Sequence, residues 1–286
     1  MKKVVILHIT LMIVSLMIVS CSSQPKNPGD IYVLRNQAEK ELDVGNREAG
    51  RGNFEAALLI LNECKRKAVL TDDPGLLIRS GLSRGNVLFS LDSRDEAFSE
   101  WEQSIALAQK YEDRELLSVS RIYNARGKLI SNSGSAQSAL DEVNREAGNI
   151  KSNQLFVAFS WHVKGLALRQ LGSYRDAEDA IKRSLDIHEK NMYLENASYD
   201  WYVIASIRSL AGNTQGALQA LESAVAIDRR IENSWGLAAG WRATGDVYRK
   251  TGKAQEARDA YQRAIAIYKA IGNEHEAAEA EKRMNN

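Results

Sequence analysis

Apolar and small residues recur along residues 31–286 at spacings that predict pairs of amphipathic helices. Three tryptophans stand forty residues apart, and each is followed by a small residue four positions later, a glycine eleven later and an alanine sixteen later. A bulky apolar residue and then a small one follow at twenty and twenty-three positions, which predicts one packed face along a second helix. Glycine supplies the turn, and small residues let two helices approach closely. The tryptophans are Trp161, Trp201 and Trp241.

Three weaker copies of this frame precede the tryptophans, so we expect six units. The six alanines at this position, one in each copy, are spaced 40, 42, 38, 40 and 40 residues apart. Gly272 is the last glycine of the chain and a natural stop for the final long helix, and the Ala- and Glu-rich residues 273–286 beyond it are expected to form a capping helix. The predicted positions are Glu41, Gly45, Gly52 and Ala57 in the first unit, Gly81, Gly85, Asp92 and Ala97 in the second, and Tyr123, Gly127, Gly134 and Ala139 in the third.

This frame resembles the tetratricopeptide repeat (TPR), whose unit is a helix-turn-helix of about 34 residues. The stretches Gly172–Ala177 and Gly52–Ala57 look like the turn and second-helix signature of that family. The resemblance implies an all-α fold, a right-handed α-solenoid of six TPR helix-turn-helix units plus a C-terminal capping helix. The longer period and the lack of a closing proline are more similar to the long-helix variant of kinesin light chains. Asp73 and Pro74 predict a unit boundary, as an N-cap followed by proline at the first helical position.

The first twenty residues have the pattern of a secretory signal peptide. A short basic start precedes the apolar run Val4–Val19, and a small residue, Ser20, follows it. The run is short for a helix that spans a bilayer permanently, which needs about 20 apolar residues. Ile18-Val19-Ser20-Cys21 resembles the bacterial lipobox, which implies that Cys21 is acylated, with palmitate among the acyl chains, and becomes the mature N-terminus. An uncleaved membrane anchor is the alternative.

These features predict three segments. Residues 1–20 are the lipoprotein signal peptide, 21–30 are the lipidated tether and 31–286 are the TPR solenoid. Ser22 follows the lipidated cysteine, where an aspartate would resemble the inner-membrane retention signal. We therefore expect a lipid-anchored protein of the cell outer membrane.

The composition of the chain excludes several kinds of partner and site. The chain has 38 basic and 37 acidic residues, so nucleic acid is not an expected partner. The two cysteines, Cys21 and Cys64, cannot form a disulfide scaffold or a Cys-rich zinc site. Cys64 falls on a small-residue position of a second helix, where we expect a buried packing thiol. The three repeat tryptophans are expected in the core.

No candidate for catalysis has the context that it needs. Gly81-Leu82-Ser83-Arg84-Gly85 matches the G-x-S-x-G elbow, but it lies in a predicted first helix and not in a strand-turn-helix. His162, His188 and His275 have no paired spacing for a metal ion. We expect His162 to face the inner groove in a hydrogen-bonding role. The sequence predicts no enzyme activity, no catalytic residue, no metal and no cofactor.

Function is expected to rest on the concave surface that the first helices of such a solenoid present. This surface is predicted to be rich in arginine and aromatic residues, the types that dominate binding hot spots, and basic enough to favour an acidic partner. The leading interpretation is a non-enzymatic scaffold that binds envelope proteins or peptides. The alternative is a ligand-binding component that cooperates with a periplasmic transporter, which a closed cavity would favour over an open groove. The predicted partner-binding residues are Arg79, Asn86, Phe89, Arg121, Asn124, Lys128, Phe159, His162, Arg169, Tyr199, Tyr202, Arg242 and Arg249.

Overall fold

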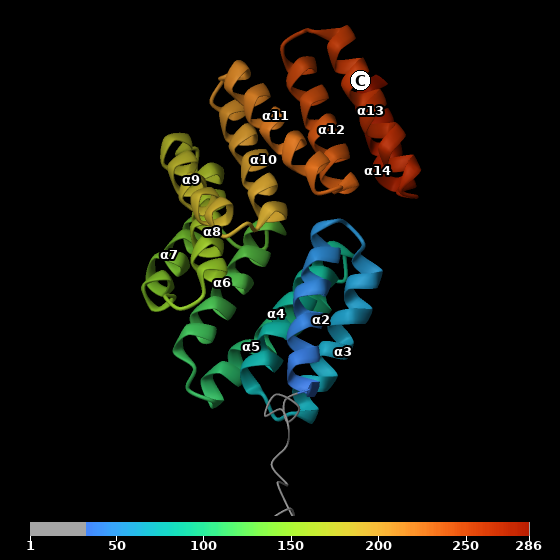
Figure 1. Ribbon diagram of the computed structural model, residues 1–286. Helices are drawn as coiled ribbons and strands as arrows, with labels where there is room; N and C mark the ends of the chain where they lie inside the picture. The colour runs from blue at the N-terminus through green and yellow to red at the C-terminus, as the bar shows by residue number, and fades with distance from the viewer. Residues whose placement is uncertain (1–32, 286) are drawn as a thin grey trace, which may run out of the picture.

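The computed structural model describes residues 33–285, and these form a curved stack of thirteen α-helices with no strand among them (Figure 1). The helices alternate as first and second members of six units, and a single helix closes the stack. This arrangement confirms the predicted solenoid of six helix pairs and a capping helix. The first helices are α2 (Val33–Gly50), α4 (Pro74–Ser90), α6 (Arg114–Ile130), α8 (Gln154–Gln170), α10 (Leu194–Leu210) and α12 (Ser234–Lys250). The second helices are α3 (Phe54–Leu70), α5 (Arg94–Lys110), α7 (Ala136–Glu146), α9 (Tyr174–Lys190), α11 (Thr214–Arg230) and α13 (Ala254–Ala270), with a short 3₁₀ turn η2 (Ala147–Asn149) after α7 and α14 (Glu274–Asn285) at the end.

Short turns with a left-handed residue connect most of these helices. Gly172 has a φ of +79°, a conformation that glycine adopts without steric cost. Asp92 has a φ of 61° at the corresponding place in the second unit, where the sequence frame already departs from glycine. At the start of α4, the Asp73 side chain accepts a 2.9 Å hydrogen bond from the Leu76 backbone N–H, and Pro74 is the first helical residue. The predicted turn glycines Gly52, Gly212 and Gly252 also have positive φ, as does Gly272, the predicted stop of the last long helix.

The small position four residues after the tryptophan allows the two helices of a unit to touch. A Cβ atom on Gly165 would lie 2.5 Å from Ile181 of α9, and one on Gly245 would lie 2.8 Å from the Tyr261 ring of α13. Both partners are buried residues of the second helix. The glycines are therefore required by helix contact, as the sequence pattern predicted.

The third unit departs from the predicted frame by two residues. Helix α6 begins at Arg114, forty residues after α4 begins and forty before α8 begins, so Arg121 and not Tyr123 occupies the position equivalent to Trp161. The turn residue with positive φ is Asn132 and not Gly134. The alignment on Ala139 was wrong because the turn between α6 and α7 is two residues longer than in the other units. Helix α7 starts correspondingly late and has 11 residues, where the other second helices have 17.

The core is a chain of apolar clusters between successive helices, with Trp101 as its largest fully buried side chain. The three repeat tryptophans are only half-buried, which corrects the prediction that they are core residues. The Arg183 guanidinium carbon lies 4.5 Å above the Trp161 ring centroid. The Trp201 indole N–H donates to Glu189 at 3.2 Å. Trp161 and Trp241 therefore lie beside an arginine of their own second helix, whereas Trp201 reaches the second helix of the preceding unit.

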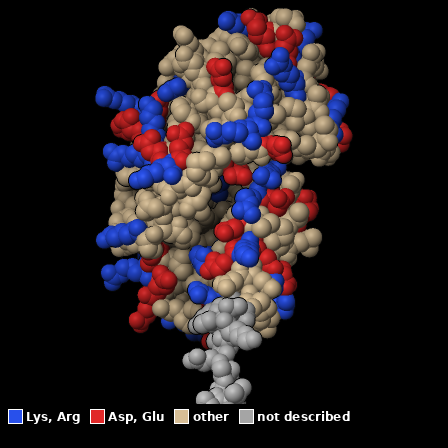
Figure 2. Space-filling model, in the orientation of Figure 1, with Lys and Arg blue, Asp and Glu red and all other residues tan. Residues whose placement is uncertain are grey.

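The stack curls until its first unit meets its last units. Arg51, in the turn between α2 and α3, lies 3.8 Å from the Glu195 carboxylate at the start of α10. Phe54 packs edge-on against Trp235 of α12, with ring centroids 5.6 Å apart. The first helices therefore surround a central hollow, which opens in the middle of the face drawn in Figure 2.

The predicted signal peptide, the lipidation site Cys21 and the tether fall within residues 1–32, outside the described part of the chain. None of the helices between Val33 and Asn285 combines the length and the hydropathy that crossing a bilayer requires.

Candidate functional site

A stripe of aromatic side chains crosses the inner layer from α6 to α10. The Tyr123 and Phe159 rings are stacked, with centroids 4.1 Å apart. One turn further along α8, the His162 ring stacks on Tyr199 at 5.1 Å, and Tyr199 stacks on Tyr202 at 6.2 Å. Tyr199 is 44% exposed, whereas the other rings of the stripe are buried or half-buried. The predicted residues Phe159, Tyr199 and Tyr202 thus lie on one surface, and Tyr199 is the ring most open to a partner. His162 is only 5% exposed and is covered by Tyr199, which corrects the prediction that it faces the groove.

A buried histidine-aspartate-histidine network lies directly beneath this stripe. Asp200 is fully buried on α10, and its two carboxylate oxygens bond Nδ1 of His162 at 2.6 Å and Nδ1 of His188 at 2.7 Å. Burial would raise the pKa of Asp200, but the hydrogen bonds from the two histidines hold it below its usual value. Desolvation lowers the pKa of His162 against the opposing effect of Asp200. The predicted hydrogen-bonding role of His162 is confirmed, and its partner ties α8, α9 and α10 together.

Asp200 was not among the predicted site residues, although the sequence contains a signal for it. The residue just before the tryptophan position is serine in the second, third and fourth units, and all three serines are buried. An aspartate at this small, buried position needs a partner that can satisfy a carboxylate. His188 supplies it from the preceding second helix. The three buried serines are Ser80, Ser120 and Ser160.

Most predicted cations of the inner surface are paired with acids from neighbouring helices. Arg79 binds Glu39 of α2 through two hydrogen bonds of 2.5 and 2.9 Å, and Arg242 binds Glu276 of α14. Arg249 lies 3.9 Å from Asp246. Because these acids neutralise the arginines, the surface offers less free positive charge than the residue count alone suggested. Two further predicted residues lie in inter-unit hydrogen bonds, Asn86 with Arg126 at 3.4 Å and Arg169 with Ser206 at 3.2 Å.

One predicted aromatic residue lies away from the inner surface. Phe89 packs against Trp101 and Phe98 of α5, with ring centroids 5.8 and 6.4 Å away. It belongs to the apolar cluster of the second unit. The last turn of α4 faces its own second helix here, so the position expected to face the groove packs inside the unit.

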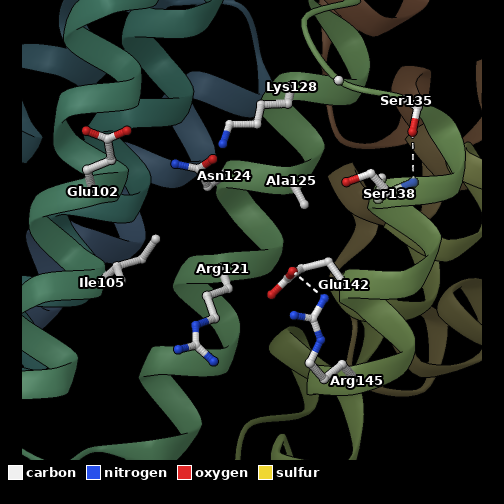
Figure 3. Close-up of a pocket in the computed structure, with 12 residues that line it drawn as sticks. Glu102, Ile105, Arg121, Asn124, Ala125, Lys128, Ser135, Ser138, Glu142 and Arg145 are labelled. Carbon is white, nitrogen blue, oxygen red and sulfur yellow. Dashed lines mark hydrogen bonds and ion pairs between the residues drawn. The ribbon is translucent and has the colours of Figure 1, made fainter.

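Three other predicted residues line a pocket on the outer layer. Arg121, Asn124 and Lys128 project from α6 into the gap between the second helices α5 and α7 (Figure 3). The two-residue shift of the third unit explains this correction, because it turns these positions from the inner face to the face that packs on second helices. The pocket has a volume of about 470 Å³. Its other polar lining residues are Glu102 on α5 and Ser135, Ser138, Glu142 and Arg145 from the start and body of α7.

The motifs that resembled chemistry have structural roles. Ser83 of the G-x-S-x-G match is buried within α4, and a Cβ on Gly85 would lie 2.3 Å from the Trp101 ring, so helix packing requires this glycine. Burial raises the pKa of the Cys64 thiol to about 12, and its Sγ bonds the Ala38 carbonyl at 3.2 Å. Cys64 is thus the expected packing thiol. No cluster of metal-ligating side chains occurs within residues 33–285.

Comparisons with known proteins agree with this geometry. Family models described as tetratricopeptide repeat match residues 160–191 and 196–270. No curated protein gives a significant match to the chain.

Several solved structures share the fold at low sequence identity. A Rap protein in complex with competence and sporulation factor is 14% identical with a TM-score of 0.60, and the alignment covers 87% of this chain and 74% of that one. The TPR-like repeats of a kinesin light chain from Podosopora anserina are 19% identical with a TM-score of 0.51, over 68% and 96% of the two chains. PilW, a type IV pilus biogenesis factor, is 13% identical with a TM-score of 0.50, over 84% and 96%. Residues 160–191 and 196–270 are therefore tetratricopeptide repeats within a chain whose described residues fold as a TPR solenoid.

Proposed function

We propose that this chain is a non-enzymatic lipoprotein of the bacterial outer membrane, a long-period TPR variant that binds partner proteins of the envelope and holds them in a complex. The observation that carries the binding part is the stacked aromatic stripe on the inner layer, which leaves Tyr199 exposed within a surface that is otherwise packed. Rigid aromatic rings provide contact area at low entropic cost, and tyrosine is enriched at binding hot spots.

The shape of the hollow favours an extended partner segment. The first helices surround the hollow, and the contact of Phe54 with Trp235 closes the ring of units, so a helix or strand threaded along the inner layer would touch several units at once. The paired arginines supply polar contacts at its rim instead of a strong positive field. Two similar folds support a binding role, since one was solved with a bound factor and another is a pilus biogenesis factor.

The binding role is tested by removing the exposed ring of the stripe. Tyr199→Ala should reduce capture of envelope partners roughly tenfold, because one anchor ring is lost without disturbing the core. Tyr111→Ala is the matched control, since Tyr111 is 45% exposed but lies at the end of α5, away from the stripe. Partners are cross-linked in native membranes and quantified by mass spectrometry. Equal losses in both variants, or no loss with Tyr199→Ala, would contradict the inner-surface role.

The anchor is tested separately by metabolic labelling. The sequence Ile18-Val19-Ser20-Cys21 supports acylation of Cys21, so Cys21→Ala should abolish incorporation of labelled palmitate. Cys64→Ala is the control, because the buried Cys64 thiol is not available to an acyltransferase. An unlabelled, unprocessed wild-type chain in its native host would exclude the lipoprotein assignment while leaving the binding role open.

A further inference from the structure

Four exposed apolar side chains lie at one end of the first unit, and we call them the apolar tip. Val33 and Leu34 begin α2, whereas Val69 and Leu70 end α3. All four are exposed, Val69 by 62% and Leu70 by 59%. Single exposed apolar residues are common on protein surfaces, but a group of them marks a surface that contacts a protein or a membrane.

The two helix ends of the apolar tip are neighbours in space. Helices α2 and α3 are joined by a short turn and run antiparallel, and the Cys64 Sγ on α3 lies 3.2 Å from the Ala38 carbonyl oxygen on α2. At the end itself, the Arg35 guanidinium lies 2.7 Å from the Asp73 carboxylate, which joins the start of α2 to the turn after α3. Figure 1 shows both helix ends at the lower end of the molecule. The four apolar side chains therefore share one surface.

The first unit differs at this place from the other units. Four further second helices also have 17 residues and begin at multiples of forty residues from α3, so their last two residues are equivalent to Val69 and Leu70. Each of these pairs contains a lysine or arginine, which a helix C-terminus favours. The apolar ending of α3 is therefore an exception within the repeat. The equivalent pairs are Gln109-Lys110, Glu189-Lys190, Arg229-Arg230 and Lys269-Ala270.

The charges around the apolar tip are nearly balanced. Arg35 is paired with Asp73, and Arg66 is paired with Glu63 at 2.6 Å. Asp72 adds one exposed carboxylate in the turn after α3. Because paired surface charges leave little net field, the tip suits a partner that it contacts through apolar groups and not through charge.

A membrane is the partner that the chain itself would bring to the apolar tip. Val33 is twelve positions after Cys21, the residue proposed to carry the lipid. Twelve residues span at most about 43 Å when fully extended, so the bilayer surface that holds Cys21 lies within that distance of the tip. A contact with a surface that is already tethered nearby is intramolecular, so it needs little affinity of its own.

We propose that the apolar tip inserts into the bilayer that holds the lipidated N-terminus. This inference rests on the proposed lipid anchor. Apolar side chains that lie in a membrane interface are buried by about 5–10 Å, at the boundary between headgroups and acyl chains. With the ends of α2 and α3 held there, the solenoid stands on its first unit, and its central hollow has a fixed height and orientation above the membrane.

Fluorescent probes on the lipidated chain test this docking. The chain is purified from its host membranes and reconstituted into vesicles of phosphatidylethanolamine and phosphatidylglycerol, in which some lipids carry a quencher on an acyl chain. Leu70→Cys places an NBD fluorophore on the tip. Leu59→Cys is the matched control, because Leu59 is 71% exposed on the same helix but lies eleven residues, or about 16 Å along the helix axis, from Leu70. We expect several-fold stronger quenching at Leu70→Cys than at Leu59→Cys. The native Cys64 is not labelled, since its thiol is buried with a pKa of about 12.

A charged version of the tip tests whether its apolar character causes the insertion. Val69→Glu combined with Leu70→Lys gives α3 the ending of α9. An NBD probe at Leu34→Cys, on the other helix of the tip, should then be quenched several-fold less than with the native ending of α3. Leu59→Lys, a charge on the same helix away from the tip, should leave the quenching at Leu34→Cys unchanged. Circular dichroism checks that each variant is folded.

Flotation of the vesicles on a density gradient separates the docking from the anchor. A chain that does not float with the vesicles would exclude the lipid anchor and this proposal with it. A chain that floats, but whose probe at Leu70→Cys is quenched no more than the probe at Leu59→Cys, would overturn the docking alone. Protection of both probes from a water-soluble quencher, without quenching by the lipid, would also overturn it, because a second copy of the chain would then cover the outer face of α3.

Discussion

The first helices of the third and fifth units begin at the same position of the repeat, but the contacts along the seam between neighbouring second helices differ in the two units. In the fifth unit, Trp201 stands on α10 and hydrogen-bonds Glu189 of the preceding second helix, so the seam is covered. In the third unit, Arg121 stands at the equivalent position of α6, and a two-residue extension of the turn displaces α7. The seam is then open as a pocket. The start of the first helix sets the repeat, but the register of the second helix decides whether neighbouring units close against each other.

The interior of the two regions differs in a related way. The small position of the second helix that is alanine at Ala68 and Ala108 becomes His188, Asp228 and Tyr268 in the last three units. At this position the first two units pack alanine, whereas the fourth and fifth units bury His188 and Asp228, which hydrogen-bond Asp200 and the pair Ser198 and Asn233. At this one position the early units use apolar packing and the last three units use polar groups. Four predictions test it, from the largest effect to the smallest.

The largest effect should follow from truncating the apolar core. Trp101 is fully buried beneath α4 and α6, so Trp101→Ala should lower the free energy of unfolding by about 3–5 kcal/mol. Trp201→Ala removes a half-buried seam ring, and its cost should be only about 1–2 kcal/mol. Urea denaturation followed by circular dichroism measures both. Equal losses of unfolding free energy would show that the half-buried Trp201 stabilises the fold as much as the fully buried Trp101.

The buried network should make stability depend on pH. The folded-state pKa of His162 is below its ordinary value, so the unfolded chain binds more protons and the free energy of unfolding falls as the pH drops below about 6.5. Asp200, whose folded pKa is also lowered, adds a further loss at more acidic pH. His162→Gln should flatten the first part of this dependence, whereas His275→Gln, at an exposed site, should not. A melting series from pH 8 to pH 5 measures this slope, and an unchanged slope in His162→Gln would contradict the role of the network.

Asp228 should make stability depend on pH in the opposite direction. Burial raises the pKa of Asp228 to about 6, so the folded state favours its neutral form and this residue costs stability as the pH rises through that value. Its carboxyl group is held by Ser198 at 2.6 Å and Asn233 at 2.8 Å. Asp228→Asn mimics the neutral form and should raise the free energy of unfolding by about 1 kcal/mol at pH 8. The gain should shrink as the pH falls below about 6 and disappear only near pH 4, where the unfolded carboxyl also binds its proton, and a gain of equal size at pH 8 and pH 4 would exclude this explanation.

The smallest effect should appear in local opening. Helix α7 has 11 residues of which four are buried, whereas α9 has 17 of which six are buried. The buried share is nearly the same in the two helices, but α7 is shorter and has fewer packed turns, so its amides should exchange with solvent several-fold faster than those of α9. Hydrogen exchange followed by mass spectrometry resolves the two helices. Equal protection would mean that the open seam does not loosen the third unit.

Much of the fold was predictable because it depends on local spacing. Gly165 and Gly172 mark a helix contact and a turn, and Asp73 with Pro74 marks a helix start, each within one unit of sequence. The pocket was not predictable, because Ala139 concealed a two-residue insertion whose effect appears only when α7 is placed in space.

The inner surface was predicted in part. Phe159, Tyr199 and Tyr202 follow the repeat, so their shared face could be inferred. The neutralised charge of Arg79 and Arg242 could not, because their acidic partners stand on neighbouring units. Pairing between units depends on the curvature of the stack, which no single repeat encodes.

The contact between the first unit and the last units has a consequence for how such a chain can change. An open solenoid tolerates the gain or loss of a repeat, because each repeat touches only its neighbours. Here Phe54 meets Trp235 and Arg51 meets Glu195 only when the intervening units make up the right arc. Adding or removing one unit would separate Phe54 from Trp235 and Arg51 from Glu195. The number of repeats is therefore constrained in this protein, as it is in a closed ring of units.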